Sequence, residues 1–415
     1  MLPTRSPRRK RFAKLLLVLV GFLFGAIIAE AALRAVGYTY PDFYQRDSVV
    51  GVSLRPDARG WYRREGEAYV RVNSDGLRDF EHSIAKPANT FRIAVVGDSY
   101  CEALSVDVNQ AFWSVMKGDL EHCSAFAGRQ VEVINFGVSG YGTAQELLTL
   151  HEKVLKYSPD LVLLAMTTNN DITDNSRALK KTDEVPYFVY RDGQLTLDDS
   201  FKQSRGFQFS NSTLGRFAAW WRTNSRVVAA VVQAQRGFKV LLASWRAKRA
   251  AKSAPAPTTN TTDKPDLFSR ADELGTDNLV YLQPTNAVWN DAWQVTEQLV
   301  LSMRDDVTRS GAKFLVVTLS NGPQVLPDPR AREYFMQRFG ITDLFYPDHR
   351  IKALGEREGI SVITLAPELQ EYAERNNVFL HGFGSNIGNG HWNVEGNRVA
   401  GQLIAKKICE DGLPK

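Results

Sequence analysis

The sequence predicts an α/β protein whose core is a five-stranded parallel sheet between two layers of helices, with an N-terminal transmembrane helix and a mostly helical insertion. Three observations support this. Short apolar, β-branched runs alternate with stretches of helical periodicity, a long uncharged apolar run lies near the N-terminus, and the alternation breaks once over a basic segment. A chain of 415 residues, 44% hydrophobic and 23% charged, is long enough for a complete core.

The strands and helices of the sheet domain follow from their periodicities. Strands are predicted at residues 91–97, 131–137, 161–167, 313–319 and 360–365, and helices at residues 109–123, 143–157, 291–311 and 349–359. Strands that alternate with helices form a parallel sheet covered on both faces. Five of them suit a flavodoxin-like, three-layer α/β/α fold, in which ligands bind at the carboxyl ends of the strands.

The N-terminus predicts export. The first fourteen residues hold six basic side chains and no acid, and an uncharged run from Leu15 to Ala29 follows, interrupted by Glu30. This length lies between the h-region of a signal peptide, about 7–15 residues, and a spanning helix of about 20. Ala29-Glu30-Ala31 also offers a small-x-small cleavage site. We favour an uncleaved signal anchor through residues 15–33 over a removed signal peptide, with the basic flank on the cytoplasmic side.

Composition divides the rest of the chain. Residues 1–37 form the tail and anchor, 38–90 an extended lead-in, and 91–184 and 281–415 the two parts of the sheet domain. Residues 185–280 form an insertion, with a hairpin at 185–199, a basic amphipathic helix within 216–252 and a flexible linker at 253–265. The basic helix packs on the domain or lies on an anionic surface. An excess of basic over acidic residues that is confined to residues 1–14 and 201–262 does not make a nucleic-acid footprint.

Three cysteines give neither a disulfide framework nor a metal-ligand spacing. Three small buried thiols are the expectation, with Cys101–Cys123 the alternative pairing in an oxidising compartment. No histidine has a partner at metal-ligand spacing, so no metal and no cofactor are predicted.

A possible catalytic constellation follows the predicted strand ends. Ser99 follows the first strand in GDSY, SGYG follows the second, Asn169 and Asn170 follow the third, and His391 precedes the last helix in GHWN. Each residue alone suits a cap, a turn or a core position. Together they supply what serine chemistry needs, which is a nucleophile, a base and donors for an oxyanion.

In these blocks the sequence resembles the SGNH (GDSL-type) hydrolases, over about 320 residues from the first core strand onward. The resemblance implies Ser99 as nucleophile and His391 as base, with an oxyanion hole from the N–H groups of Ser99 and Gly140 and the side chain of Asn170. Gly137 is the weaker candidate for the glycine. NSDGLRD (residues 73–79) and the anchor resemble the exported bacterial branch, which implies a single-pass inner-membrane protein with a periplasmic catalytic domain.

One departure from the family pattern bears on the chemistry. The family places an aspartate two or three residues before the histidine, where this chain has Asn389 and Gly388. The group that orients His391 is therefore Asn389, a backbone carbonyl or a distant acid. Loss of the orienting charge can cost ~10⁴ in rate.

The resemblance implies a membrane-anchored serine esterase that hydrolyses O-acyl, typically O-acetyl, esters on a polysaccharide through an acyl-serine intermediate. Two alternatives share part of this interpretation. An O-acyltransferase would pass the acyl group to a sugar hydroxyl, and a catalytically impaired relative would only bind the polysaccharide.

Overall fold

The computed structural model describes residues 7–38, 42–253, 276–410 and 412. It divides the chain into two compact units, Met1–Asp42 with Phe209–Thr262 and Phe43–Gln208 with Asp263–Lys415. We describe each unit by itself. The predicted linker at 253–265 falls, apart from Ser253, outside the described residues.

The second unit contains the predicted sheet. All five strands are parallel and lie in the order β11-β10-β7-β5-β6. Their bounds are Thr90–Gly97 (β5), Gln130–Asn135 (β6), Leu161–Thr167 (β7), Lys313–Leu319 (β10) and Ser361–Thr364 (β11). The order, read from β6, is the flavodoxin-like one, in which the chain direction across the sheet reverses beside the first strand. Because β5 is that first strand, the residues just after Gly97 lie where a ligand site is expected.

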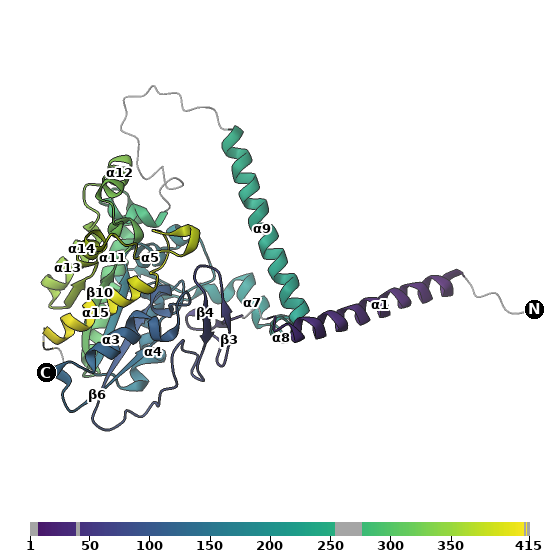
Figure 1. Ribbon diagram of the computed structural model, residues 1–415, viewed down its shortest axis with the longest axis horizontal. Coiled ribbons are helices and arrows are strands. Elements are labelled where there is room, and N and C mark those ends of the chain that lie inside the picture. The colour runs from purple at the N-terminus through teal and green to yellow at the C-terminus, as the bar shows by residue number, and fades with distance from the viewer. Residues whose placement is uncertain (1–6, 39–41, 254–275, 411, 413–415) are drawn as a thin grey trace, which may run out of the picture. The chain divides into compact units, whose positions relative to one another are not determined.

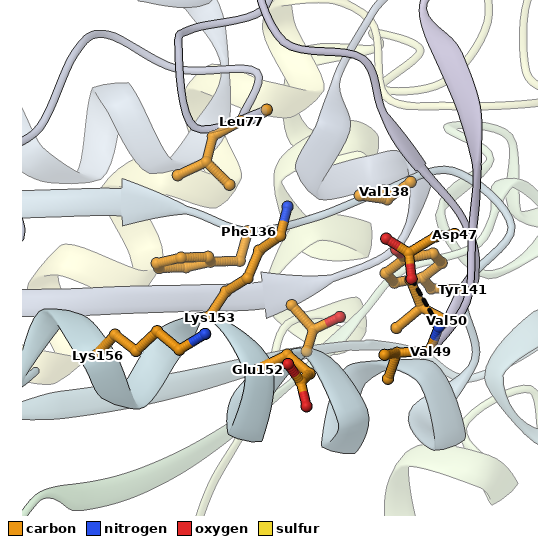
Figure 2. Close-up of a pocket in the computed structure, with 12 residues that line it drawn as sticks. Asp47, Val49, Val50, Leu77, Phe136, Val138, Tyr141, Glu152, Lys153 and Lys156 are labelled. Carbon is orange, nitrogen blue, oxygen red and sulfur yellow. Dashed lines mark hydrogen bonds between the residues drawn. The ribbon is translucent and has the colours of Figure 1, made fainter.

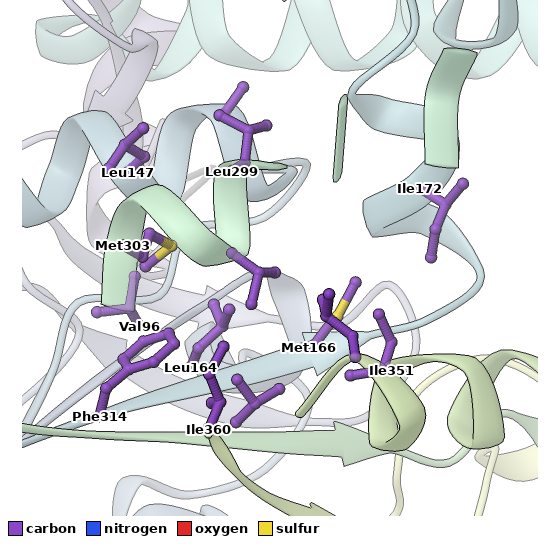
Figure 3. Close-up of a cluster of buried hydrophobic side chains, with 14 of the residues drawn as sticks. Val96, Leu147, Leu164, Met166, Ile172, Leu299, Met303, Phe314, Ile351 and Ile360 are labelled. Atoms are coloured by element: carbon purple, nitrogen blue, oxygen red, sulfur yellow. The ribbon is translucent and has the colours of Figure 1, made fainter. Parts of the chain in front are cut away.

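Helices cover both faces of this sheet (Figure 1). One face packs on α4 (Thr143–Glu152), α11 (Ala287–Arg309) and α13 (Tyr346–Glu358), around side chains such as Val96, Leu164 and Met303 (Figure 3). The other packs on α3 (Phe112–Leu120), α14 (Ala366–Asn376) and α15 (Val394–Glu410). Strands that are buried on both faces explain the continuous apolar runs in the sequence.

The lead-in is more structured than the extended segment expected from sequence. It forms two antiparallel hairpins, β1–β2 (Tyr44–Asp47 with Gly51–Leu54) and β3–β4 (Arg59–Tyr62 with Ala68–Arg71). Their inner side chains, among them Leu54 and Val70, join Leu104, Tyr141 and Leu148 in a third buried cluster. The strands are four residues each, too short for the alternation to stand out from the surrounding arginines and acids.

A cavity of about 210 Å³ lies between the first hairpin and α4 (Figure 2). Apolar side chains such as Val50 and Phe136 line it together with Lys153 and Lys156. Burial lowers the pKa of Lys153. None of the residues implicated above in catalysis lines this cavity.

The remaining elements of the second unit lie on the connections. The predicted hairpin of the insertion is present as β8 (Tyr187–Arg191) and β9 (Gln194–Asp198). Further helices are α2 (Ser99–Glu102), α5 (Asn170–Asp174), α6 (Arg177–Lys180) and α12 (Pro329–Phe339), and α7 (Arg205–Asn211) includes the unit boundary after Gln208. Of these, α2 and α5 begin at or next to residues of the candidate site.

The first unit consists of α1 (Pro7–Ala35), α8 (Thr213–Asn224) and α9 (Arg226–Ser253). Within α1, Phe12–Ala35 is long and apolar enough to cross a membrane, and none of it is buried. The carboxylate of Glu30 accepts hydrogen bonds from the N–H groups of Arg226 and Val227 and from the Ser225 hydroxyl. The predicted basic helix is thus two helices, which meet at Ser225.

The expectation of three buried thiols was wrong, and so was the alternative Cys101–Cys123 pairing. Cys123 and Cys409 form a disulfide between the end of α3 and the end of α15, and Cys101 is a buried thiol. α3 and α15 pack side by side on the same face of the sheet, which brings the two sulfurs together across a sequence separation of 286 residues. Disulfides persist in oxidising compartments, so this pair accords with an exported domain.

Candidate active site

Ser99 lies immediately beyond the carboxyl end of β5. The chain leaves the strand at Gly97, and Asp98 caps the short helix α2 by accepting a hydrogen bond from the N–H of Tyr100 (2.9 Å). Asp98 and Tyr100 are buried, whereas Ser99 is only partly covered. A buried residue on each side fixes the backbone of Ser99 and leaves its hydroxyl accessible.

The structure brings His391 to this hydroxyl. Nε2 of His391 lies 2.8 Å from Oγ of Ser99, although the two residues are 292 positions apart. The loop of His391 is tied to the sheet domain by a bridge between His381 and Trp392 and by the bond from the Gly382 N–H to the His391 carbonyl (2.9 Å). A nucleophile and a base in hydrogen-bond contact are the first requirement of serine chemistry.

The other ring nitrogen of His391 meets a carboxylate. Nδ1 donates to Oε2 of Glu65 at 2.5 Å, and the backbone N–H of His391 donates to Oε1 of the same side chain at 2.8 Å. With Nδ1 as donor, Nε2 is the acceptor of the Ser99 proton, which is the tautomer a general base needs. Ser99, His391 and Glu65 thus have the geometry of a catalytic triad.

Asn389 does not occupy the orienting position. The carboxylate of Glu65 fills the place beside Nδ1, and the carbonyl of Asn389 instead accepts from the side chain of Asn386 (3.4 Å). Of the alternatives left open by the sequence, the structure gives a distant acid. No spacing rule could have identified it, because Glu65 lies in the lead-in, 326 residues before His391.

Glu65 reaches His391 from the tip of the β3–β4 hairpin, and two glycines permit the approach, Gly66 on the hairpin and Gly390 on the loop of His391. A Cβ on Gly390, whose φ is +81°, would lie 2.0 Å from Oε1 of Glu65. A Cβ on Gly66 would lie 2.1 Å from the carbonyl oxygen of Ser105. Only glycine fits such close contacts, so the sequence at both ends of this interaction is matched to it.

The charges of the pair reinforce each other. Burial of the His391 ring opposes its protonation, but the hydrogen bond and charge of Glu65 outweigh this and raise the pKa of His391 above its ordinary value. Burial opposes ionisation of Glu65, yet its bonds to His391 outweigh this and lower the pKa of the carboxylate. Glu65 is therefore ionised at neutral pH and favours the imidazolium that forms when His391 takes a proton.

A second histidine holds the His391 loop from behind. His381 is buried and donates from Nδ1 to the carbonyl of Gly390 (2.8 Å), while its Nε2 meets the hydroxyl of Ser320 (3.1 Å). Ser320 in turn accepts from the indole N–H of Trp392 (2.8 Å). Burial lowers the pKa of His381 to about 4, so the ring is neutral and donates from one nitrogen only.

The side chain of Asn170 contacts Asp98, the residue directly before the nucleophile. Its Nδ2 donates one hydrogen to Oδ2 of Asp98 (2.8 Å), the residue directly before Ser99, and Asp98 also accepts from the hydroxyl of Thr167 (3.0 Å). The amide of Asn170 carries a second N–H, as an oxyanion donor requires. Asp98 thus orients Asn170 and caps the helix of Ser99 at once.

The two candidate glycines differ in what their backbones do. The N–H of Gly137 is taken up by Oδ1 of Asn135 at 3.0 Å. Gly140 is exposed in a turn with φ +78°, which suits glycine. Its neighbour Ser139 donates from both backbone and hydroxyl to Glu102 of α2, which ties this turn to the helix of Ser99. Among the described residues, no group of three potential ligands could hold a metal ion.

Of the comparisons with known proteins, only the one with solved structures gave matches. No family model and no curated protein matches the sequence. An acetyl xylan esterase structure is 13% identical, with 77% of this chain and 100% of that chain covered and a TM-score of 0.36. An acetylxylan esterase from Geobacillus stearothermophilus is 11% identical, with 77% and 94% covered and a TM-score of 0.37. A lipase/acylhydrolase from Enterococcus faecalis is 13% identical, with 77% and 96% covered and a TM-score of 0.35.

At identities and TM-scores this low, these likenesses carry no conclusion about the activity of this chain.

Proposed function

We propose that this protein is a serine esterase that hydrolyses O-acyl, chiefly O-acetyl, esters on a polysaccharide on the extracytoplasmic side of a bacterial inner membrane. The observation that carries the proposal is the continuous chain of contacts from Ser99 through His391 to Glu65. It removes the reason for regarding the site as impaired, because Glu65 supplies the acid that this chain lacks at the position of the family's aspartate.

The first half-reaction acylates the serine. Oγ of Ser99 attacks the acyl carbonyl carbon while its proton passes to Nε2 of His391. The negative charge that develops on the carbonyl oxygen is held by the N–H groups of Ser99 and Gly140 and by Nδ2 of Asn170. The intermediate then collapses, the sugar hydroxyl leaves with the proton from His391, and the acyl group remains on Ser99.

The second half-reaction regenerates the enzyme. Water gives a proton to His391 as it attacks the acyl-serine, the oxyanion forms in the same place, and the carboxylic acid departs as Ser99 recovers its proton. Glu65 stays ionised throughout and holds the ring in one tautomer. The residues of the site supply every proton transfer that the two steps need.

The proposed location rests on α1 and on the disulfide. The apolar helix follows a basic flank, which favours a cytoplasmic N-terminus, and Cys123–Cys409 suits an oxidising compartment. We extend the proposal to the basic helices α8 and α9, whose residues 216–252 would contact anionic lipid.

The test compares the full chain, purified in detergent, with its Ser99→Ala and His391→Ala variants on p-nitrophenyl acetate. Each variant is expected to lose on the order of 10⁴ in kcat/KM. Ser302→Ala serves as the matched control, because the hydroxyl of Ser302 donates only to the backbone carbonyl of Gln298 within α11. Unchanged hydrolysis in Ser99→Ala would contradict the proposal.

A further inference from the structure

The β3–β4 hairpin that carries Glu65 has an outer face with an unusual composition. Side chains alternate along both strands, so Gly60, Ala68 and Val70 are buried while Arg59, Trp61, Tyr69 and Arg71 are exposed. The register pairs these outward residues directly, Arg59 with Arg71 and Trp61 with Tyr69. The outer face is therefore an aromatic pair beside an arginine pair.

The aromatic pair forms a platform. The rings of Trp61 and Tyr69 lie 5.6 Å apart, edge to face, and remain 42% and 39% exposed. The guanidinium of Arg63 lies 4.8 Å from the Trp61 ring and that of Arg71 lies 5.7 Å from the Tyr69 ring. Such cation–π contacts fix the rings while leaving part of their surface open.

Without a ligand, repulsion between Arg59 and Arg71 destabilises the pairing of β3 and β4. Like charges directly opposite each other on an antiparallel pair destabilise it. Arg63 is paired with Glu67 at 2.9 Å, whereas neither Arg59 nor Arg71 has an acidic partner among the residues that the structure describes. Guanidinium groups bind carboxylates in a planar, two-pronged geometry, so a carboxylate placed here would offset the repulsion.

The position of this face connects it to catalysis. Trp61 precedes Glu65 by four residues and Tyr69 follows it by four. At about 3.3 Å per residue, the Cα atoms of both residues lie within roughly 13 Å of the Cα atom of Glu65, the acid beside His391. A polymer bound on the rings can therefore extend to Ser99.

We propose that Arg59, Trp61, Tyr69 and Arg71 form a subsite for an acidic glycan chain. Sugar rings stack their apolar faces on Trp61 and Tyr69, and uronate carboxylates bind Arg59 and Arg71. This inference rests on the proposed function in one respect, because it identifies the acylated polysaccharide of that reaction as a polyanion. The hairpin then serves substrate binding through its face and catalysis through its tip.

Binding is measured on the full chain in detergent carrying Ser99→Ala, so that the result does not depend on turnover. The probes are an oligogalacturonate and a xylo-oligosaccharide of equal length, titrated calorimetrically at low and high salt. We expect tighter binding of the acidic oligomer, weakened by salt. Arg59→Gln with Arg71→Gln should weaken its binding about tenfold, and Trp61→Ala should weaken the binding of both oligomers.

The matched control is Arg191→Gln with Lys352→Gln, which removes the same charge from two exposed positions on other elements. Equal affinity for the two oligomers, or the same loss in the control as in the Arg59 and Arg71 variant, overturns the subsite. The p-nitrophenyl acetate assay fails or succeeds separately. Acidic binding without ester hydrolysis would refute the esterase and leave the subsite, whereas hydrolysis without acidic binding would do the reverse.

Discussion

Oε2 of Glu65 lies 2.5 Å from Nδ1 of His391, although the two residues are separated by 326 positions. The base stands before the last helix of the sheet domain and the acid at the tip of a hairpin that precedes its first strand. The lead-in is thus a structural part of the proposed active site. Catalytic competence requires the hairpin to be folded against the domain.

Glu65→Gln should keep the hairpin in place and lose the orienting charge. Oε1 can still accept from the backbone N–H of His391, but an amide donor facing Nδ1 favours the wrong tautomer. We expect kcat for p-nitrophenyl acetate to fall by ~10³–10⁴ with little change in KM. Glu67→Gln, which removes an equal charge from the same hairpin where it only pairs with Arg63, should remain active. Equal activity of both variants would exclude Glu65 as the orienting acid.

The pH dependence of kcat/KM should report the interaction between Glu65 and His391. Only the form with an unprotonated Nε2 can accept the Ser99 proton, so kcat/KM falls as pH decreases through the pKa of His391. Glu65 raises that pKa above its ordinary value of about 6.5, which places the acidic limb at higher pH than for an isolated histidine. Glu65→Gln removes the charge and should move the limb to lower pH. A limb that stays in place would show that another group controls the titration.

The sheet was predictable because its signals are local. Four of the five strands are short runs that are mostly buried on both faces, the edge strand β11 is only partly buried, and all five appear within two residues of their predicted bounds. The helices α4, α11 and α13 follow from periodicity in the same way. Burial of a whole strand or of one helix face leaves a pattern in consecutive residues, and this pattern is all that the sequence analysis required.

The acid was not predictable because nothing local marks it. Glu65 lies in an arginine-rich hairpin whose two strands have four residues each. Only the folded chain shows that Gly66 and Gly390 make room for it. The disulfide has the same character. Cys123 and Cys409 pair because α3 and α15 pack on the same face of the sheet, a relationship between elements at opposite ends of the domain.

The disulfide should determine how many thiols are reactive and should raise the free energy of unfolding. Protein taken from an oxidising compartment and unfolded without reductant should expose one reactive thiol, that of Cys101, and three after reduction. Closing so long a loop restricts the unfolded chain, so reduction should lower the free energy of unfolding by about 3–5 kcal/mol. Urea unfolding with and without reductant measures this, and Cys123→Ser with Cys409→Ser should be insensitive to reductant. Three reactive thiols before reduction would refute the bond.

We expect α1 to be retained because of its contacts within the first unit. Cleavage after Ala31 would remove Glu30, whose carboxylate accepts from two backbone N–H groups at the start of α9 and from the hydroxyl of Ser225. Those donors are among the ones that a helix start must satisfy. We expect the intact mass of protein extracted from membranes to include residues 1–31, and the protein to resist extraction by alkaline carbonate. A mass that begins at Ala32 would show a removed signal peptide.

The aromatic face of α8 gives a test of lipid contact. Leu214, Phe217, Trp220 and Trp221 recur at helical spacing and are 73%, 53%, 60% and 46% exposed, and no acid occurs from residue 201 to residue 262. Aromatic side chains with basic neighbours suit the interface of an anionic bilayer. In nanodiscs of brominated phosphatidylglycerol, tryptophan fluorescence should therefore be quenched.

Trp220→Phe with Trp221→Phe should remove most of that quenched component, because these two indoles would lie at the depth of the brominated chains. Trp289→Phe, at a buried position in α11 (2% exposed), should leave the quenching as it was. Replacing the lipid by brominated phosphatidylcholine separates the two forces that act on α8, since aromatic insertion survives the loss of lipid charge and basic attraction does not. Quenching that is unaffected by the double substitution would place α8 away from the bilayer.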